Sequence, residues 1–282
     1  MELIEGKVVA KKIREELQEE VAKLKDKGII PKLAVILVGD DPASKIYVRN
    51  KNKACEKIGI EFEEHFFSSD ISQAKLDECI DSLNANKEIN GILLQYPIPK
   101  HLDVDEAFRR ISPEKDVDGF NPINVGKLCL GQDTFISCTP YGIMKMLEHY
   151  NINPEGKHAV VIGRSNIVGK PMAQCLLKAN STVTICHSKT QNLKEITKQA
   201  DILVAAIGKP KFVTEEMIKN KSVIIDVGIN RLEDGSIVGD VDFENVSKKA
   251  NYISPVPGGV GPMTITMLLN NVVKATKEQN NI

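Results

Sequence analysis

A lysine and a glutamine are the residues of this 282-residue chain whose surroundings suit them best to chemistry. Lys51 lies one turn after Tyr47 on a helix predicted over Pro42–Ile58, so the two side chains are neighbours. We expect this face of the helix to point into the core, together with Ala54, Cys55 and Ile58. Desolvation lowers the pKa of a lysine, and a lysine with a pKa of about 7–8 can act as a general base. The alternative is that the stem of Lys51 packs while its amine reaches water.

Gln95 and Asp118 are two further candidates for a catalytic role. Gln95 stands near the end of a strand predicted over Gly91–Tyr96, and ligands of open α/β sheets bind at the carboxyl ends of the strands. Asp118 lies within residues 111–132, a stretch with prolines, glycines and asparagines that is typical of a long functional loop or domain junction. Plainer interpretations stay open. Loop backbone can satisfy the hydrogen bonds of the Gln95 amide, and Asp118 or Asp116 can simply stabilise a turn.

A turn suited to phosphate binding is the sharpest signal in the second half of the chain. The strand predicted over His158–Ile162 ends at Gly163, and a helix begins near Lys170 within the sequence GRSNIVGKP. Backbone N–H groups of such a turn, and the helix N-terminus behind it, favour an anion. Ser165 stands where the dinucleotide fingerprint has its middle glycine, and Pro171 does not fit a Walker A loop. The pattern predicts a dinucleotide site, with an ordinary strand–turn–helix as the alternative.

The following strand indicates which dinucleotide is preferred. Folds that bind NAD place a carboxylate about 20 residues downstream, where it holds the ribose 2′-hydroxyl. Here the strand Thr182–Cys186 runs into His187, Ser188 and Lys189, with no acid. Arg164, Ser188 and Lys189 suit a 2′-phosphate instead, because the geometry of a guanidinium matches phosphate. We therefore expect NADP as the cofactor.

A segment dense in proline and glycine, Tyr252–Thr264, is a further candidate for ligand contact. It reads YISPVPGGVGPMT and holds three prolines and three glycines. Proline stiffens the backbone, and glycine lets the backbone approach a ligand closely. A rigid loop between domains is the plainer interpretation.

The elements that must position these residues alternate between strand and helix in both halves of the chain. Strands are predicted at 32–38, 61–67, 91–96, 158–162, 182–186, 202–206 and 222–227, and helices at 5–27, 42–58, 72–84, 140–150, 170–178, 192–199, 214–219 and from 263 onward. Such alternation is typical of βαβ units around parallel sheets. We expect two α/β domains, an N-terminal one of βαβ units and a C-terminal Rossmann-like one that binds the dinucleotide.

Composition narrows the class of protein. The net charge of −1 gives no support to binding of nucleic acid or anionic lipid. The six cysteines form no CxxC pair and the five histidines lack zinc-ligand spacing, so neither disulfides nor a metal are expected. The N-terminal stretch does not resemble a signal peptide, and no run of about 18 apolar residues could span a membrane. We expect a cytoplasmic protein with reduced thiols.

The motifs together resemble those of the bifunctional methylenetetrahydrofolate dehydrogenase/methenyltetrahydrofolate cyclohydrolase family. The resemblance runs over essentially the whole chain, and several separated motifs in the right order are more specific than any one of them. They are YVRNK (47–51), GILLQYPIP (91–99), PEKDVDGF (113–120), CTP (138–140), GRSNIVGKP (163–171), GDVDF (239–243) and PVPGGVGPMT (255–264). Tyr96 stands where many members of the family have leucine.

The resemblance implies a domain plan and an activity. Residues 1–138 would form a folate-binding catalytic domain, on which a final helix over 264–282 packs back, and 139–263 an NADP-binding domain across a cleft. The enzyme would oxidise 5,10-methylenetetrahydrofolate with NADP and hydrolyse the methenyl product to 10-formyltetrahydrofolate. A homodimer is also implied.

The resemblance further implies a role for each candidate residue. Lys51 would be the central catalytic group, Gln95 its partner, and Asp118 a hydrogen-bonding partner of the pterin. Tyr47 would stack on the aminobenzoyl ring of the folate. The folate pocket would be lined by Gly258, Gly259, Val260, Gly261 and Pro262, and NADP would be held by Gly163, Arg164, Ser165, Gly169, Ser188 and Ile229.

Three alternatives compete with this assignment. A monofunctional dehydrogenase would lack the hydrolytic step, although the joint presence of Lys51 and Gln95 argues against it. An unrelated NADP oxidoreductase, such as a shikimate dehydrogenase-like protein, would leave the tyrosine–lysine pair unexplained. A non-catalytic NADP-binding regulator would bind cofactor without turnover, and no damaged site favours it.

Overall fold

The computed structural model describes residues 1–282, which form two discontinuous compact units. The N-terminal unit comprises residues 12–136 and 265–282, and the C-terminal unit comprises residues 1–11 and 137–264. The first eleven residues therefore group with the second half of the chain, which differs from the predicted domain plan. The reason is a strand pair, because β1 (Glu2–Leu3) lies parallel to β11 (Tyr252–Ile253).

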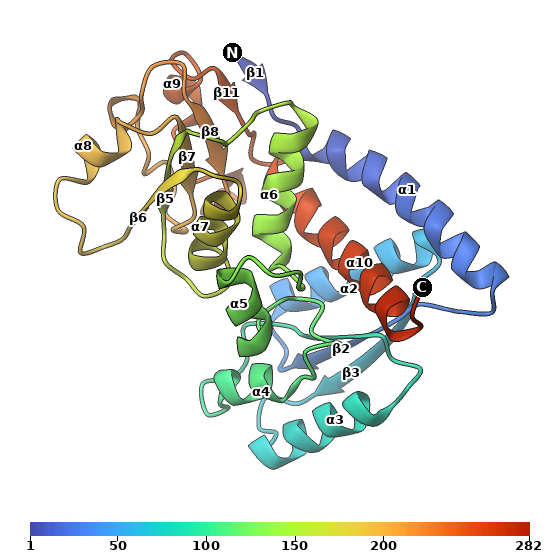
Figure 1. Cartoon of the computed structure of the whole chain (residues 1–282). Coiled ribbons are helices and arrows are strands. Elements are labelled where there is room, and N and C mark those ends of the chain that lie inside the picture. Colours follow the sequence, from blue (N-terminus) through green and yellow to red (C-terminus); the bar gives the residue numbers. More distant parts are fainter. The chain divides into compact units, whose positions relative to one another are not determined.

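The N-terminal unit is built on a parallel three-stranded sheet in the order β3-β2-β4. The strands are β2 (Lys32–Val38), β3 (Glu61–Phe67) and β4 (Gly91–Leu94). Successive side chains of a strand point to opposite faces. Ala34, Ile36 and Val38 pack with Leu76 and Ile80 from the helix α3 (Gln73–Ala85). The helix α2 (Pro42–Ile58) lies on the other face (Figure 1).

The terminal helices run side by side in this unit. They are α1 (Gly6–Asp26) and α10 (Val260–Gln279), of which residues from 12 and from 265 onward belong here. Arg14 Nε donates to Thr266 Oγ1 at 2.8 Å, and Lys277 Nζ forms an ion pair with Glu20 at 2.6 Å (Figure 1). Residues 265–282 therefore belong to the N-terminal unit, where they pair with α1.

Two short helices follow β4 in the N-terminal unit. They are α4 (Val104–Arg110) and α5 (Pro122–Cys129). The prediction of an irregular loop over 111–132 was wrong for α5. Asn121 caps this helix by accepting a hydrogen bond from Ile123 N at 2.8 Å, and Pro122 fits the first helical position.

The C-terminal unit contains a parallel six-stranded sheet in the order β1-β11-β8-β7-β5-β6. The remaining elements of the unit are β5 (His158–Ile162), β6 (Thr182–Cys186), β7 (Ile202–Ala205), β8 (Val223–Asp226), the antiparallel pair β9 (Asn230–Arg231) and β10 (Ile237–Val238), the helices α6 (Cys138–His149), α7 (Gly169–Lys178), α8 (Leu193–Thr197) and α9 (Phe243–Val246), and a 3₁₀ turn at Glu215–Met217. The predicted parallel sheet and Rossmann-like arrangement are confirmed.

The strand order identifies where a ligand is expected in this unit. From β5 the chain passes to β6 on one side, and then to β7 on the other side of β5. Ligands of doubly wound sheets bind outside the carboxyl ends of the strands at such a reversal. Gly163 and Ala206, which follow β5 and β7, meet at this point, because Ala206 N donates to Ile162 O at 2.8 Å.

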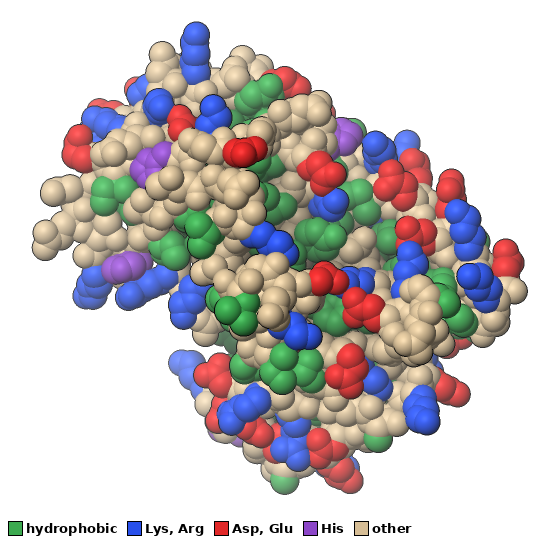
Figure 2. All heavy atoms as spheres, in the orientation of Figure 1, with side chains coloured by type: hydrophobic (Ala, Val, Ile, Leu, Met, Phe, Trp, Pro, Cys, Tyr) green, Lys and Arg blue, Asp and Glu red, His purple; other side chains and the backbone are tan.

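Charged side chains of both signs are intermixed on the face drawn in Figure 2, as the net charge of −1 leads one to expect. None of the helices has the length and apolar character needed to span a membrane.

Candidate active site

Lys51 and Gln95 meet in the N-terminal unit. Lys51 Nζ donates a 2.7 Å hydrogen bond to Gln95 Oε1, and Gln95 Nε2 donates to the carbonyl of Tyr96 at 2.8 Å. The amide of Gln95 is thus used at both ends, which fixes its orientation. Gln95 is 8% exposed and Lys51 is partly buried. A buried amide therefore holds the amine of Lys51 in place at the carboxyl end of β4.

The helix α2 presents Lys51 along the edge of its buried face. Ser44, Val48, Cys55 and Ile58 are buried, and Lys51 continues this row at helical spacing. The expectation that Tyr47 faces the core was wrong, because its side chain is 44% exposed. One residue corresponds to about 100° around a helix, so Tyr47 sits to the side of the row that Val48 occupies.

Cys55 is next to Lys51 on the helix and does not compete with it as a reactive group. Burial raises the pKa of the Cys55 thiol to about 12, although the nearby charge of Lys51 acts in the opposite direction. The thiol stays protonated at neutral pH, and a thiol is a far weaker nucleophile than a thiolate.

Asp118 lies in a loop that its neighbour Asp116 shapes. Asp116 is buried, and its carboxylate accepts four hydrogen bonds: from Gly119 N and Phe120 N at 3.1 Å, and from Asn121 N and Asn124 Nδ2 at 2.8 Å. Lys115 is also buried, and its ammonium donates to the carbonyls of Leu83, Asn84 and Asn86. Asp116 is therefore the structural acid of this motif, and Asp118 is the partly exposed one.

Asp116 also makes stability depend on pH. Burial raises the pKa of its carboxyl from 3.8 to about 6, against the opposing effect of its hydrogen bonds. The folded state therefore holds this proton more tightly than the unfolded state, and the resulting stabilisation is lost as pH rises from about 4 to about 6. We expect Asp116→Asn to lower the free energy of unfolding by about 1 kcal/mol more at pH 5 than at pH 7. Urea unfolding of both proteins at the two pH values measures this, and a pH-independent difference would contradict it.

The turn after β5 is closed by two glycines. A Cβ at Gly169 would overlap the carbonyl oxygen of Gly163, and a Cβ at Gly163 would overlap the carbonyl oxygen of Ala206. Ser165 Oγ accepts from the backbone N–H of Val168 and Gly169 at 3.2 and 3.3 Å, at the start of α7. The backbone thus turns tightly into a helix N-terminus, as a phosphate site requires.

Arg164 and Ser188 lie beyond neighbouring strand ends. Ile162 of β5 pairs in register with Cys186 of β6, so each of the two residues stands two positions past this pair. Both are exposed. Lys189 is exposed as well, and no carboxylate follows β6 before Glu195. Hydrogen-bond donors without a neighbouring carboxylate suit the binding of a 2′-phosphate.

The proline–glycine segment leads directly into α10, which begins at Val260 rather than at the predicted residue 263. Gly258 has a φ of 102° and its carbonyl accepts from Lys7 N at 3.0 Å. A Cβ at Gly259 would lie 2.5 Å from Pro255 O, so this position also requires glycine. A Cβ at Gly261 would lie 3.6 Å from Cδ1 of Ile229, which is 51% exposed. Ile229 therefore lies beside the start of α10, within the C-terminal unit.

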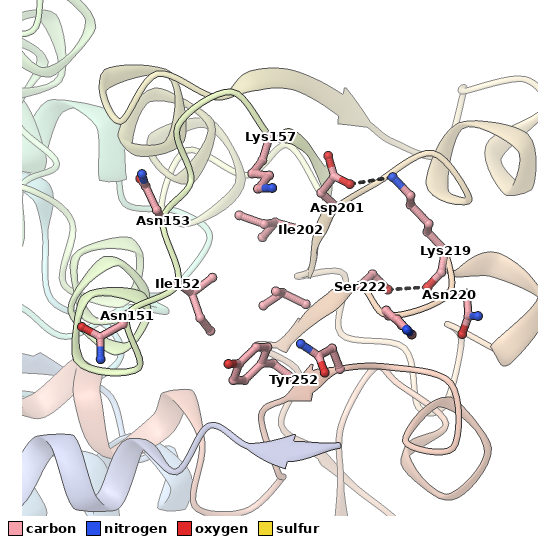
Figure 3. A pocket seen from close by; sticks show the side chains of 13 residues that line it. Asn151, Ile152, Asn153, Lys157, Asp201, Ile202, Lys219, Asn220, Ser222 and Tyr252 are labelled. Atoms are coloured by element: carbon pink, nitrogen blue, oxygen red, sulfur yellow. Dashed lines mark hydrogen bonds and ion pairs between the residues drawn. The ribbon is translucent and has the colours of Figure 1, made fainter.

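A separate pocket of about 290 Å³ lies at the amino ends of the strands in the C-terminal sheet (Figure 3). It is lined by residues at the amino ends of β5, β7, β8 and β11, among them Lys157, Ile202, Ser222 and Tyr252. Asp201 at its rim is paired with Lys219 at 2.6 Å. This place distinguishes the pocket from the turn at Gly163, which lies at the carboxyl end of β5.

The fold and these residues define a class of protein: a two-unit α/β enzyme with a glycine turn suited to phosphate in one unit and a lysine–glutamine pair in the other. Family models make the assignment specific. Residues 4–118 match the catalytic domain of tetrahydrofolate dehydrogenase/cyclohydrolase, and residues 137–280 match its NAD(P)-binding domain. The chain belongs to the tetrahydrofolate dehydrogenase/cyclohydrolase family.

Individual relatives agree over nearly the full length. "Bifunctional protein FolD" of Campylobacter hominis is 57% identical over 279 residues, which cover 99% of this chain and 98% of the relative. The crystal structure of the bifunctional enzyme FolD from Campylobacter jejuni is 53% identical, with a TM-score of 0.98 and full coverage of both chains. A Trypanosoma brucei FolD structure, complexed with NADP and inhibitor, is 37% identical with a TM-score of 0.95, over 99% of this chain and 98% of that one. The predicted family is thereby confirmed.

Proposed function

We propose that this chain oxidises 5,10-methylenetetrahydrofolate with NADP and hydrolyses the methenyl product to 10-formyltetrahydrofolate, with Lys51 and Gln95 serving the second step. Membership of the bifunctional family supports the two activities. The observation that carries the residue assignment is the 2.7 Å hydrogen bond from Lys51 Nζ to the buried Gln95.

In the oxidation, the residues of the chain position the reactants. Bound NADP would supply the acceptor for the hydride that leaves the methylene carbon. The Gly163–Gly169 turn would receive its phosphates through backbone N–H groups, with Ser165 holding the start of α7. Ile229 would contact the cofactor beside Gly261. Hydride transfer depends on placement more than on acid or base, so we assign no proton transfer to this step.

In the hydrolysis, water attacks the cationic methenyl carbon, and Lys51 takes a proton from that water. Gln95 would keep the amine aimed at the reacting carbon, because its other end is held by the Tyr96 carbonyl. The tetrahedral adduct opens as the bond from this carbon to N5 breaks. N5 receives a proton and the formyl group stays on N10.

The remaining residues would hold the folate. Tyr47 offers an exposed ring to the aminobenzoyl group. Asp118 would hydrogen-bond the pterin from the loop that Asp116 shapes. Gly258, Gly259, Val260, Gly261 and Pro262 would line the pocket with closely approaching backbone.

Separate assays of the two steps test this function. Purified protein supplied with methylenetetrahydrofolate and NADP is expected to form NADPH, and protein supplied with methenyltetrahydrofolate alone is expected to hydrolyse it. Failure of the first assay would contradict the dehydrogenase assignment, and failure of the second would leave a monofunctional dehydrogenase.

Arg164 is expected to set the preference for NADP. Because a charge-assisted bond to phosphate is lost, Arg164→Ala should reduce the ratio of kcat/KM for NADP to that for NAD by about tenfold or more. Steady-state kinetics with both cofactors measure the ratio. An unchanged ratio would rule out contact between Arg164 and the 2′-phosphate.

We also propose a cytoplasmic homodimer. All six cysteines are free thiols, which suits a reducing compartment. β6 is an edge strand with an exposed Ile185, and such edges are ready to pair with a second chain. Light scattering should give twice the 31.1 kDa mass of one chain, and a monomer at micromolar concentration would contradict the dimer.

A further inference from the structure

Two buried aspartates in the C-terminal unit have no part in the assignments above. Asp226 is the last residue of β8 and is 3% exposed, and Asp240 follows β10 and is fully buried. The hydrogen bonds that their carboxylates accept come from backbone N–H groups and one side-chain amide. A carboxylate is costly to bury without a cation, so this arrangement calls for a role.

Asp240 gathers the loop that follows β7. Its Oδ2 accepts from the N–H groups of Ile207 and Gly208 at 2.7 and 3.0 Å, and its Oδ1 accepts from Lys209 N at 2.8 Å. Three successive N–H groups converging on one anion form a nest. Gly208 has a φ of 63°, which such a curved backbone requires. The loop at the carboxyl end of β7 is thus wrapped around a carboxylate of the chain itself.

Asp240 also reaches the loop that follows β8. Its Oδ1 accepts from Asn230 Nδ2 at 3.0 Å, and Asn230 is the residue after Ile229. A Cβ at Gly228 would overlap Oδ1 of Asp240, so the β8 loop passes directly over this carboxylate. One side chain therefore links two loops at the edge of the sheet where dinucleotides bind.

Asp226 holds Asp240 in place. Its Oδ1 accepts from the N–H groups of Asp240 and Gly228 at 2.8 and 2.9 Å, and its Oδ2 accepts from Val241 N at 2.9 Å. A Cβ at Gly239 would overlap Oδ2 of Asp226. Because Gly228 and Gly239 have no side chain, the carboxylates of Asp240 and Asp226 can pack directly against the backbone.

We propose that Asp240, braced by Asp226, is a positioning residue that shapes the loops after β7 and β8 to receive the dinucleotide. The inference rests on the proposed use of NADP, and it assigns no direct contact between either carboxylate and the cofactor. It predicts an effect on NADP binding and oxidation that leaves hydrolysis of supplied methenyltetrahydrofolate intact, since that reaction uses no cofactor.

Asp240→Asn tests the inference. The amide nitrogen would face N–H donors in place of an accepting oxygen, so at least one loop contact is lost. The dissociation constant for NADP, measured by calorimetry, and the KM for NADP should both rise by about tenfold or more. The rate of methenyltetrahydrofolate hydrolysis should stay within about twofold of wild type.

Two further variants keep the test decisive if Asp240→Asn folds poorly. Asn230→Ala removes a single hydrogen bond to Asp240 and should weaken NADP binding by about threefold to tenfold, again without loss of hydrolysis. Asp242→Asn is the matched control, because its carboxylate accepts from Asn245 Nδ2 and joins neither loop. It should leave NADP binding unchanged.

The outcomes separate this inference from the proposed function. Unchanged NADP affinity in both Asp240→Asn and Asn230→Ala would overturn the inference, as would equal loss of NADP binding and hydrolysis in Asn230→Ala. Wild-type protein that binds NADP without turning it over would contradict the proposed oxidation. The calorimetric comparison of variants would still test the positioning role in that case.

Discussion

Replacing Lys51 with methionine should lower the rate of methenyltetrahydrofolate hydrolysis by about 100- to 10,000-fold, the usual contribution of a general acid or base. Methionine has a similar length and keeps the apolar stem, so the row along α2 stays packed. It removes the amine and leaves Gln95 Oε1 without the hydrogen bond from Nζ. The oxidation of methylenetetrahydrofolate should fall less, because that step needs positioning rather than proton transfer.

Lys53→Met is the matched control for this variant. Lys53 lies two residues further on the same helix and is exposed. The same chemical change there should leave both activities at wild-type level. Retained hydrolysis in Lys51→Met would rule out Lys51 as the base, and equal loss of both activities would indicate a role in holding the folate instead.

Replacing Gly169 with alanine should weaken NADP binding by about 5- to 150-fold, which corresponds to the 1–3 kcal/mol typical of overpacking. The added methyl group would overlap the Gly163 carbonyl and lie 2.8 Å from Arg164 N. These are backbone atoms, so the turn itself must shift. Titration calorimetry with NADP measures the loss, and hydrolysis of supplied methenyltetrahydrofolate should change far less.

Gly126→Ala provides the control for a methyl group added at a glycine. Gly126 lies within α5, where a Cβ would meet no atom within 4 Å. Alanine there should favour the helix by about 1 kcal/mol and leave NADP binding unchanged. Wild-type NADP affinity in Gly169→Ala would mean that the turn after β5 does not receive the cofactor.

The regular elements were predictable because their signals are local. The predicted bounds agree with the structure for β2, β3, β5, β6 and α2. The apolar runs and the Asp41-Pro42 start of α2 are patterns of residues adjacent in the sequence. α5 was missed although Asn121-Pro122 is a start signal like Asp41-Pro42, because the helix has only eight residues and is held by contacts such as that of Asn124 with Asp116. The pairing of β1 with β11 joins opposite ends of the chain, and no local pattern reveals it.

The candidate site, too, could be predicted only in part from the sequence. The turn at Gly163 and the position of Lys51 on its helix could be read from spacing, whereas the bond from Lys51 to Gln95 required the placement of α2 against β4. In the sequence, Asp240 is only one residue of the motif GDVDF (239–243), and nothing there predicts a role for it. Its role depends on loops that follow two different strands, which only the folded sheet brings to one carboxylate.

The most direct test of the two-step activity is one absorbance time course with methylenetetrahydrofolate and NADP, following NADPH and the methenyl species together. We expect NADPH to rise while the methenyl species stays low in the wild type, and both to rise together in Lys51→Met. Lasting build-up of the methenyl species in the wild type would contradict the hydrolase activity, and no change with NADP or NAD would contradict the account as a whole.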